Sequence, residues 1–347
     1  MKQILFWTAA AGALLLSACN NVEPETPADS GSLAVTVSQE LQTKAVSTTA
    51  LDHEKQLNKM RVLVYDSAGE LYKDEALTSP FTSKTIPNVK TGTYSVYALA
   101  NTCAAVSDVK TTAKLSATAV TLSDCSFTAS TGFVMHGGQT GISVAAGSTA
   151  TPANIAVTRY PARVKLVSVK NGLAASLGDL TVENVMLING YSSWNLGATG
   201  SPTTSMNAAG RSGNGSGDII ASAASADLAA YSFKEVPAAD QTLASGSAAK
   251  TYGYYFYSFP NTVSTDKTGA KVTGGKARLV VKAKFGGKSY YYPVTLSSIE
   301  RNKCYDVSLI ITGAGSDDPN VPVVKGSLGV TISVSDWTEG SDYTETI

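Results

Sequence analysis

The sequence predicts an all-β protein built from two β-sandwich domains with one or two short helices. A chain of 347 residues is long for a single small domain and suits two. Charged residues make up 16% of it and hydrophobic residues 43%, which is enough for apolar cores but poor material for long amphipathic helices. Many short apolar segments, separated by turn-forming residues, are typical of sandwich folds.

The N-terminus reads as an export signal. A short cationic start precedes an apolar run over residues 4–18, which ends in Leu16-Ser17-Ala18-Cys19. The run is too short for a comfortable membrane span and suits a signal peptide of residues 1–18. Its end resembles the lipobox of bacterial lipoproteins. We therefore expect cleavage before Cys19 and attachment of a diacylglycerol, with fatty acids such as palmitate, to the Cys19 thiol.

The first half of the mature chain reads as strands with one helical segment. Residues 20–31 have the composition of a tether. The segment that follows alternates strictly between apolar and polar side chains, with Leu33, Val35 and Val37 on one face, and predicts a half-buried strand. Helical spacing of apolar residues predicts a short helix within residues 104–115. Further strands are expected over residues 60–65, 92–100, 132–138 and 153–157.

The second half continues in the same style. A stretch rich in Gly, Ser, Ala and Thr over residues 197–230 predicts a long exposed excursion. The connector over residues 313–322 leads to a final strand over residues 328–337. The remaining strands are expected over residues 159–169, 181–189, 251–259, 277–285, 289–296 and 305–312, with a hairpin turn near residues 284–289.

The first and last strands are alike in sequence. Residues 32–38 and residues 327–333 match at five of seven positions. Each presents aliphatic side chains on one face, and in the last strand these are Leu328, Val330, Ile332 and Val334. Two strands of one shape could fill one groove, although any two strands of a protein rich in Thr, Val and Ser can look alike.

Several classes of function lack support in the sequence. Basic and acidic residues balance at 27 each, so the chain has no cationic excess for nucleic acid. The His136-Gly137-Gly138 segment has no Gly-x-Ser-x-Gly nucleophile motif to accompany it. The Asp317-Asp318 pair lacks the spaced oxygen ligands of a calcium loop. We expect no enzyme activity, no cofactor and no metal site.

Cysteine and tyrosine patterns leave alternatives open. After Cys19, the chain has Cys103, Cys125 and Cys304, and the first two either pair or remain thiols. Tyrosines gather within residues 252–257 and 290–292. Such clusters usually cover a core or an interface, and less often form a platform that stacks against sugars.

The sequence resembles the major fimbrial subunits, or fimbrillins, of the Bacteroidetes (type V pilins of the FimA type). The C-terminal block, Ile-Glu-Arg-Asn-Lys-Cys-Tyr-Asp-Val-Ser-Leu-Ile-Ile-Thr-Gly-Ala-Gly over residues 299–315 followed by residues 330–337, is specific to that family. Supporting stretches occur in the family's order at residues 59–66, 93–102 and 158–165.

The resemblance implies two transthyretin-like β-sandwich domains, over residues 45–158 and 159–347, and export as a lipidated precursor. It also implies a propeptide, residues 19–44, that a trypsin-like protease removes with the first strand. The position that matches the cleavage site is Lys44, before Ala45, where the family usually has arginine. The C-terminal strand of a neighbouring subunit, residues 328–337 including Trp337, would then fill the place of Leu33, Val35 and Val37. We expect this strand to be dispensable for the subunit's own sandwich.

These observations favour a structural pilus subunit that supports adhesion. Its partners would be copies of itself, other pilus subunits, the maturation protease, a transient lipid anchor in the outer membrane, and a host or bacterial surface receptor. It would pass from the cell outer membrane, as a lipoprotein precursor, to an extracellular fimbrium. The alternatives are a surface lipoprotein that binds glycan without polymerising, and an anchor subunit of the same pilus.

Overall fold

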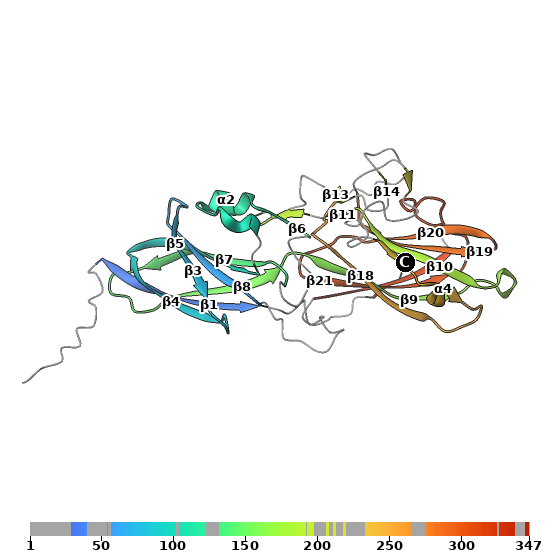
Figure 1. Cartoon of the computed structure of the whole chain (residues 1–347), viewed down its shortest axis with the longest axis horizontal. Helices are drawn as coiled ribbons and strands as arrows, with labels where there is room; N and C mark the ends of the chain where they lie inside the picture. The colour runs from blue at the N-terminus through green and yellow to red at the C-terminus, as the bar shows by residue number, and fades with distance from the viewer. Residues whose placement is uncertain are drawn as a thin grey trace, which may run out of the picture.

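The computed structural model describes residues 29–39, 54, 57–101, 104–122, 132–191, 193–197, 206–207, 211–212, 218–219, 233–264, 275–324, 326–336 and 344–346. The predicted site residues Cys19, Lys44, Ala45 and Trp337, with Cys103 and Cys125, lie outside these ranges. Strands dominate the fold and form two halves that follow each other along its long axis (Figure 1). The all-β prediction is confirmed. Among the described residues, no helix has the length and apolar character needed to cross a membrane.

The N-terminal half is one seven-stranded sheet that is folded into two layers. Its strand order is β3-β2-β5-β7-β8-β1-β4. Strands β7 and β8 pair at two positions only, Met135 with Arg159 and His136 with Thr158, so the sheet bends sharply there. The bounds are β1 Ser30–Gln39, β2 Met60–Tyr65, β3 Leu71–Leu77, β4 Ser83–Lys90, β5 Gly92–Ala100, β7 Met135–Val144 and β8 Thr151–Arg159. Apolar side chains of both layers meet in a single core.

The C-terminal half is a sandwich of two five-stranded sheets around a second core. One sheet has the order β16-β10-β19-β20, with β17 also paired to β10, and the other has the order β18-β9-β21-β22-β23. The bounds are β9 Ala162–Asn171, β10 Leu180–Ile188, β16 Phe233–Glu235, β17 Thr242–Leu243, β18 Lys250–Ser258, β19 Arg278–Phe285, β20 Lys288–Thr295, β21 Lys303–Ile311, β22 Leu328–Asp336 and β23 Thr344–Thr346.

Small elements complete the fold. They are β6 Ala119–Thr121, β11 Gly190–Tyr191, β12 Ser193–Asn195, β13 Met206–Asn207, β14 Arg211–Ser212, β15 Asp218–Ile219, the α-helices α2 Thr112–Ala117 and α4 Ala238–Gln241, and the 3-10 helices η1 Ala104–Ser107 and η2 Ala175–Leu177. The predicted single helix is divided into η1 and α2, because Thr111 forms a β-bridge with Glu70 and its side chain then caps α2 by accepting from the Lys114 amide.

The two halves are joined by more than the chain crossing from β8 to β9. Strand β12, from the second half in sequence, pairs antiparallel with β6 from the first half. Side chains of the second half, among them Trp194 and Phe259, also pack into the N-terminal core. The two halves are therefore connected by strand pairing and by core packing as well as by the chain itself.

Candidate functional site

Strand β1 lies inside the N-terminal sheet as a fully engaged member. It runs parallel to β8, with Leu33 opposite Thr151 and Val37 opposite Ile155. On its other side it runs antiparallel to β4, with Leu33 opposite Ile86. In the part of the chain that the structure describes, β4 has no other strand partner. We call the space that β1 occupies between β8 and β4 the β1 site.

The predicted alternation of β1 is borne out by burial. Leu33, Val35 and Val37 are 0%, 1% and 5% exposed and belong to the N-terminal core. Thr36 and Ser38 between and beyond them are exposed. Full burial of an aliphatic side chain contributes roughly 1.5–3 kcal/mol to the free energy of folding. The three buried side chains of β1 therefore contribute substantially to the stability of the N-terminal half.

The start of the β1 site, at the position of Gly31, accepts glycine only. A Cβ added at Gly31 would collide with Ser148 Oγ and would lie 2.5 Å from the Ala145 carbonyl oxygen. The adjoining backbone is fixed, because the Ser32 amide donates to the Ser148 carbonyl at 2.8 Å and the Gly147 amide donates to the Ser30 carbonyl at 2.8 Å. Any strand that occupies this site therefore needs a glycine before its apolar alternation. We did not predict this requirement from the sequence.

The glycine extends the likeness between the two ends of the chain. Gly326 precedes Ser327 as Gly31 precedes Ser32, so residues 31–38 and 326–333 match at six of eight positions. At its present location, Gly326 has open space where a Cβ would project. Crowding therefore requires glycine at position 31, whereas at position 326 the space is open and glycine is favoured by its positive φ of 95°. Extending the match of the two segments by one residue toward the N-terminus would have revealed the shared glycine.

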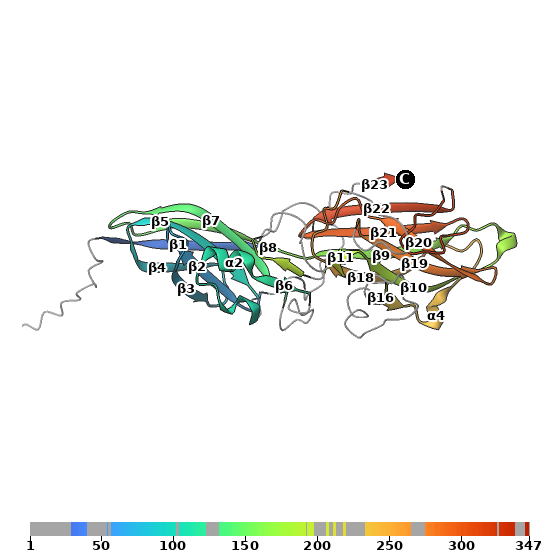
Figure 2. The ribbon, with the colours of Figure 1, turned by 90° about the horizontal axis from the view of Figure 1, so that it is seen from above.

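Strand β22 lies in the sheet of its own half. It pairs with β21 along its length, from Ile311 opposite Leu328 to Lys303 opposite Asp336, and β23 lies on its other side (Figure 2). Ile332 is 8% exposed and belongs to the C-terminal core, while Leu328, Val330 and Val334 are partly buried against it. The strand is therefore part of its own sandwich in this structure, and its dispensability stays a prediction.

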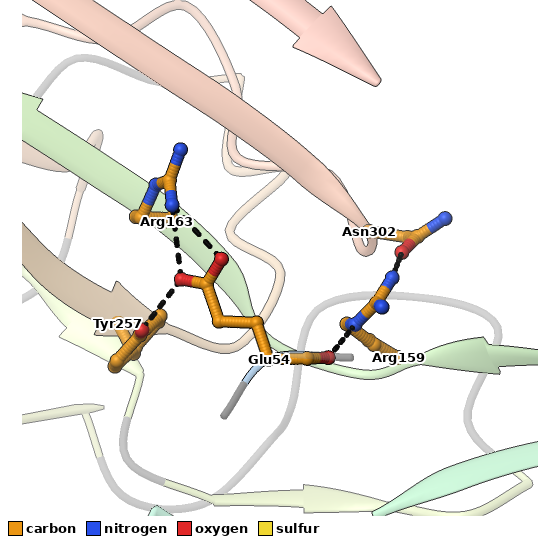
Figure 3. A network of polar contacts seen from close by, with 5 residues as sticks. All are labelled: Glu54, Arg159, Arg163, Tyr257 and Asn302. Atoms are coloured by element: carbon orange, nitrogen blue, oxygen red, sulfur yellow. Dashed lines mark hydrogen bonds and ion pairs between the residues drawn. The ribbon is translucent and has the colours of Figure 1, made fainter. Parts of the chain in front are cut away.

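A buried polar network joins the halves where sequence reasoning placed no function (Figure 3). Both Glu54 carboxylate oxygens accept from Arg163 Nη1, at 3.0 and 2.9 Å, and the Tyr257 hydroxyl donates to Glu54 Oε1 at 2.6 Å. Arg159 Nε donates to the Glu54 carbonyl oxygen at 2.7 Å, and Arg159 Nη1 donates to Asn302 Oδ1 at 3.2 Å. Burial lowers the pKa of Arg159 to about 10 and raises that of Tyr257.

The candidate cysteine and tyrosine side chains that the structure describes are packed into or against the C-terminal half. Cys304 is buried, and burial raises the pKa of its thiol to about 12. Tyr252 and Tyr254 stack on each other with ring centroids 5.9 Å apart, and both pack against the C-terminal core. Within the described ranges, no group of three or more His, Cys, Asp or Glu side chains is placed to hold a metal ion.

Comparison with known proteins supports the resemblance seen in the sequence. Residues 30–181 match the family model of the major fimbrial subunit protein (FimA). This confirms the predicted likeness to the fimbrillins.

Solved structures share the fold at low identity. A candidate cell adhesion protein from Bacteroides eggerthii superposes with a TM-score of 0.64 at 20% identity, over 90% of this chain and 97% of the other. A second, from Parabacteroides distasonis, gives 0.63 at 19% identity, over 91% and 99%. A fimbrilin (FimA) from Porphyromonas gingivalis gives 0.61 at 15% identity, over 90% and 99%. The two-sandwich architecture is therefore that of a solved fimbrilin.

Proposed function

We propose that this chain, which matches the major fimbrial subunit family over residues 30–181 and has the fold of a solved fimbrilin, is a structural subunit of a surface fimbria. It is made as a lipoprotein precursor, loses β1 by proteolysis, and polymerises when the C-terminal strand of a neighbour takes over the β1 site. The pilus that results supports adhesion. Its partners are other copies of the chain and other pilus subunits.

The observation that carries the proposal is the glycine requirement of the β1 site. A replacement strand must offer glycine at the crowded head, then aliphatic side chains at alternate positions facing the core. Residues 326–333 offer Gly326 followed by Leu328, Val330 and Ile332, in the spacing of Gly31, Leu33, Val35 and Val37. Backbone pairing with β8 and β4 would fasten the incoming strand, as in other cases of β-strand addition.

Burial favours the exchange. In its own sheet, β22 keeps Leu328 and Val330, which correspond to Leu33 and Val35, only partly buried. The corresponding aliphatic positions of the β1 site are at most 5% exposed. Moving a side chain from partial to full burial removes more apolar surface from water. The cost of leaving the β22 location is thus offset by deeper burial in the neighbour.

Contacts of the connector before β22 indicate where the segment that moves with β22 would begin. Its first part is held to the C-terminal sheet, because Ser316 and Tyr291 exchange two backbone hydrogen bonds of 2.8 Å. Asn320 is 1% exposed and accepts from Arg278 Nη1. Beyond it, Val321 and Val324 are exposed. Displacement of β22 would therefore begin after Asn320 and leave the earlier connector in place.

The two alternative functions, a glycan-binding lipoprotein and an anchor subunit, make different predictions. A glycan-binding lipoprotein would use exposed tyrosines, yet Tyr252 and Tyr254 cover the C-terminal core and Tyr252 donates to the Asp240 carbonyl. An anchor subunit would retain its lipid on Cys19. Residues 19–44 as a removable propeptide, followed by domains over residues 45–158 and 159–347, fit the polymerising subunit.

Substitution of two glycines tests the proposal. Gly326→Ala places a methyl group that its own location tolerates apart from the strain of a positive φ of 95°. In the β1 site of a neighbour, the same methyl group meets Ser148 and Ala145. The control is Gly246→Ala, at a φ of 73° with equally open surroundings and no part in the exchange.

We expect both variants to fold and to be processed, and the Gly326 variant alone to lose filaments, scored by electron microscopy of cells. Normal filaments from the Gly326 variant would contradict the proposal. Equal loss from both variants would attribute the effect to backbone strain and would also count against it.

A further inference from the structure

Glu54 fastens the segment that follows the propeptide to both halves of the molecule. Its carboxylate binds Arg163 of β9 and Tyr257 of β18, which belong to the C-terminal half. Its carbonyl oxygen accepts from Arg159 at the end of β8, which belongs to the N-terminal half. The Glu54 side chain is 0% exposed and that of Arg163 is 3% exposed. One residue thus ties three strands across the boundary.

Because the charged groups around Glu54 are buried, removing the Glu54 carboxylate should destabilise the joint between the halves. Two guanidinium groups, Arg159 and Arg163, are almost fully buried within the reach of one glutamate. A buried ion pair adds little over a well-packed apolar pair, but removing one partner is strongly destabilising because charge is left in a low-dielectric interior. Loss of the Glu54 side chain would take away the carboxylate that pairs with Arg163 and leave both guanidinium groups buried.

The position of Glu54 in the chain gives the attachment a consequence for maturation. It follows the predicted Lys44–Ala45 cleavage bond and precedes Lys55, Lys59 and Arg61, which a trypsin-like protease could also use. Cleavage at Lys44 removes β1 and keeps Glu54. Cleavage at any of the other three would remove Glu54 together with β1.

We propose that Glu54 is the retention point of maturation, the residue that limits how much of the N-terminus proteolysis can remove. The inference rests on the proposed function, since it assumes that β1 is removed. A protease that cuts directly after Glu54 must first pull Glu54 out of its contacts with Arg159, Arg163 and Tyr257, whereas cleavage after Lys44 leaves those contacts in place. The residues just before β2 have a separate attachment that does not involve Glu54, because the Asn58 amide donates to Asn101 Oδ1 at 2.8 Å.

Limited digestion of the full-length precursor with trypsin tests this without any filament. In the wild-type protein, we expect a stable product that begins at Ala45. In Glu54→Ala, a product that begins at Gln56 should form at least tenfold faster. Glu54→Gln should lie between, because its amide oxygen can still accept from Arg163 or Tyr257. The control is Glu75→Ala, which removes a more exposed ion pair with Lys84 of 2.8 Å and should leave the wild-type pattern.

Two results would overturn the inference. One is wild-type cleavage after Lys55 or Lys59 as fast as cleavage after Lys44. The other is an unchanged fragment pattern in both Glu54 variants. If Glu54→Ala fails to fold, the wild-type pattern and Glu54→Gln still decide. Filament loss or persistence in the glycine variants above tests the proposed function independently, because this digestion is read on the monomeric precursor.

Discussion

Gly31 lies so close to Ala145 that a Cβ at position 31 would stand 2.5 Å from the Ala145 carbonyl oxygen. A backbone oxygen cannot turn aside as a side chain can, so the strand in this position must have glycine there. The chain contains one other segment, beginning at Gly326, that joins glycine to the same Ser-Leu-x-Val-Thr sequence. This steric demand is the physical basis for regarding the two ends of the chain as alternative occupants of one site.

Core packing of β1 should matter to the precursor and not to the mature subunit. Leu33→Ala deletes a fully buried side chain and should lower the free energy of unfolding of the precursor by about 2–5 kcal/mol. After maturation the residue is gone, so mature filaments from this variant should equal wild-type filaments in stability. Urea unfolding of both forms checks this, with exposed Thr36→Ala as the control. A destabilised mature form would contradict the removal of β1.

Lipidation should depend on Cys19 alone. Cys19→Ala should abolish incorporation of labelled palmitate and leave unprocessed precursor without surface filaments, because signal cleavage of a lipoprotein requires the modified cysteine. Cys103→Ala is the matched control and should incorporate label normally. Filaments of normal abundance from Cys19→Ala would show that export does not use this route.

The mature N-terminus should be Ala45. Mass spectrometry of subunits sheared from cells should find it, and Lys44→Gln should prevent its formation, since a trypsin-like protease needs the cationic side chain. Substitution of Lys73, on the edge strand β3, serves as the control. A mature chain that begins at Cys19 would instead indicate an anchor subunit or a plain lipoprotein.

Acid should weaken the fold through His136. Its ring stacks on Tyr97 with centroids 5.5 Å apart, and its Nδ1 lies 2.9 Å from the Tyr160 hydroxyl. Burial first, and then the charge of Arg301, lowers its pKa to about 4. The unfolded chain binds a proton near pH 6.5, so this contribution to stability is complete above that pH and is lost as the pH falls toward 4.

The loss should reach on the order of 3 kcal/mol. Urea unfolding at pH 7, 5.5 and 4.5 measures it, and comparison with His136→Gln separates it from the titration of carboxylates. We expect the variant to show a smaller fall in stability with acid. Equal falls in both proteins would mean that His136 has an ordinary pKa in the folded state.

Periodicity in the sequence predicted the strands that have one buried face. Alternation identified β1 and β22, and both form strands with the expected residues inward. It did not predict β3 or β4. Strand β3 is a mostly half-buried edge with Leu77 as its buried side chain, and β4 buries only Ile86 and Val89. Such strands are specified by pairing with their neighbours, which a local pattern does not contain.

The candidate site was only partly predictable for a similar reason. Likeness of the two end strands indicated a shared groove, but the glycine requirement depends on Ala145 and Ser148, which are distant in sequence. Glu54 gave no signal, because a single glutamate in a polar segment is ordinarily solvent-exposed. Arg159 and Arg163 offered a weak one, as charged residues in otherwise apolar strands near the predicted domain boundary.

Engineered disulfides test the central claim most directly, by reporting which strand lies beside Thr331 in assembled filaments. In its own sheet, Thr331 is opposite Ser308 of β21. In the β1 site it would take the place of Thr36, which is opposite Asn154 of β8. Purified filaments of Asn154→Cys/Thr331→Cys should show a ladder of covalent multimers under oxidation, and those of Ser308→Cys/Thr331→Cys should show none. Crosslinked monomers from the second pair, with no ladder from the first, would contradict strand exchange.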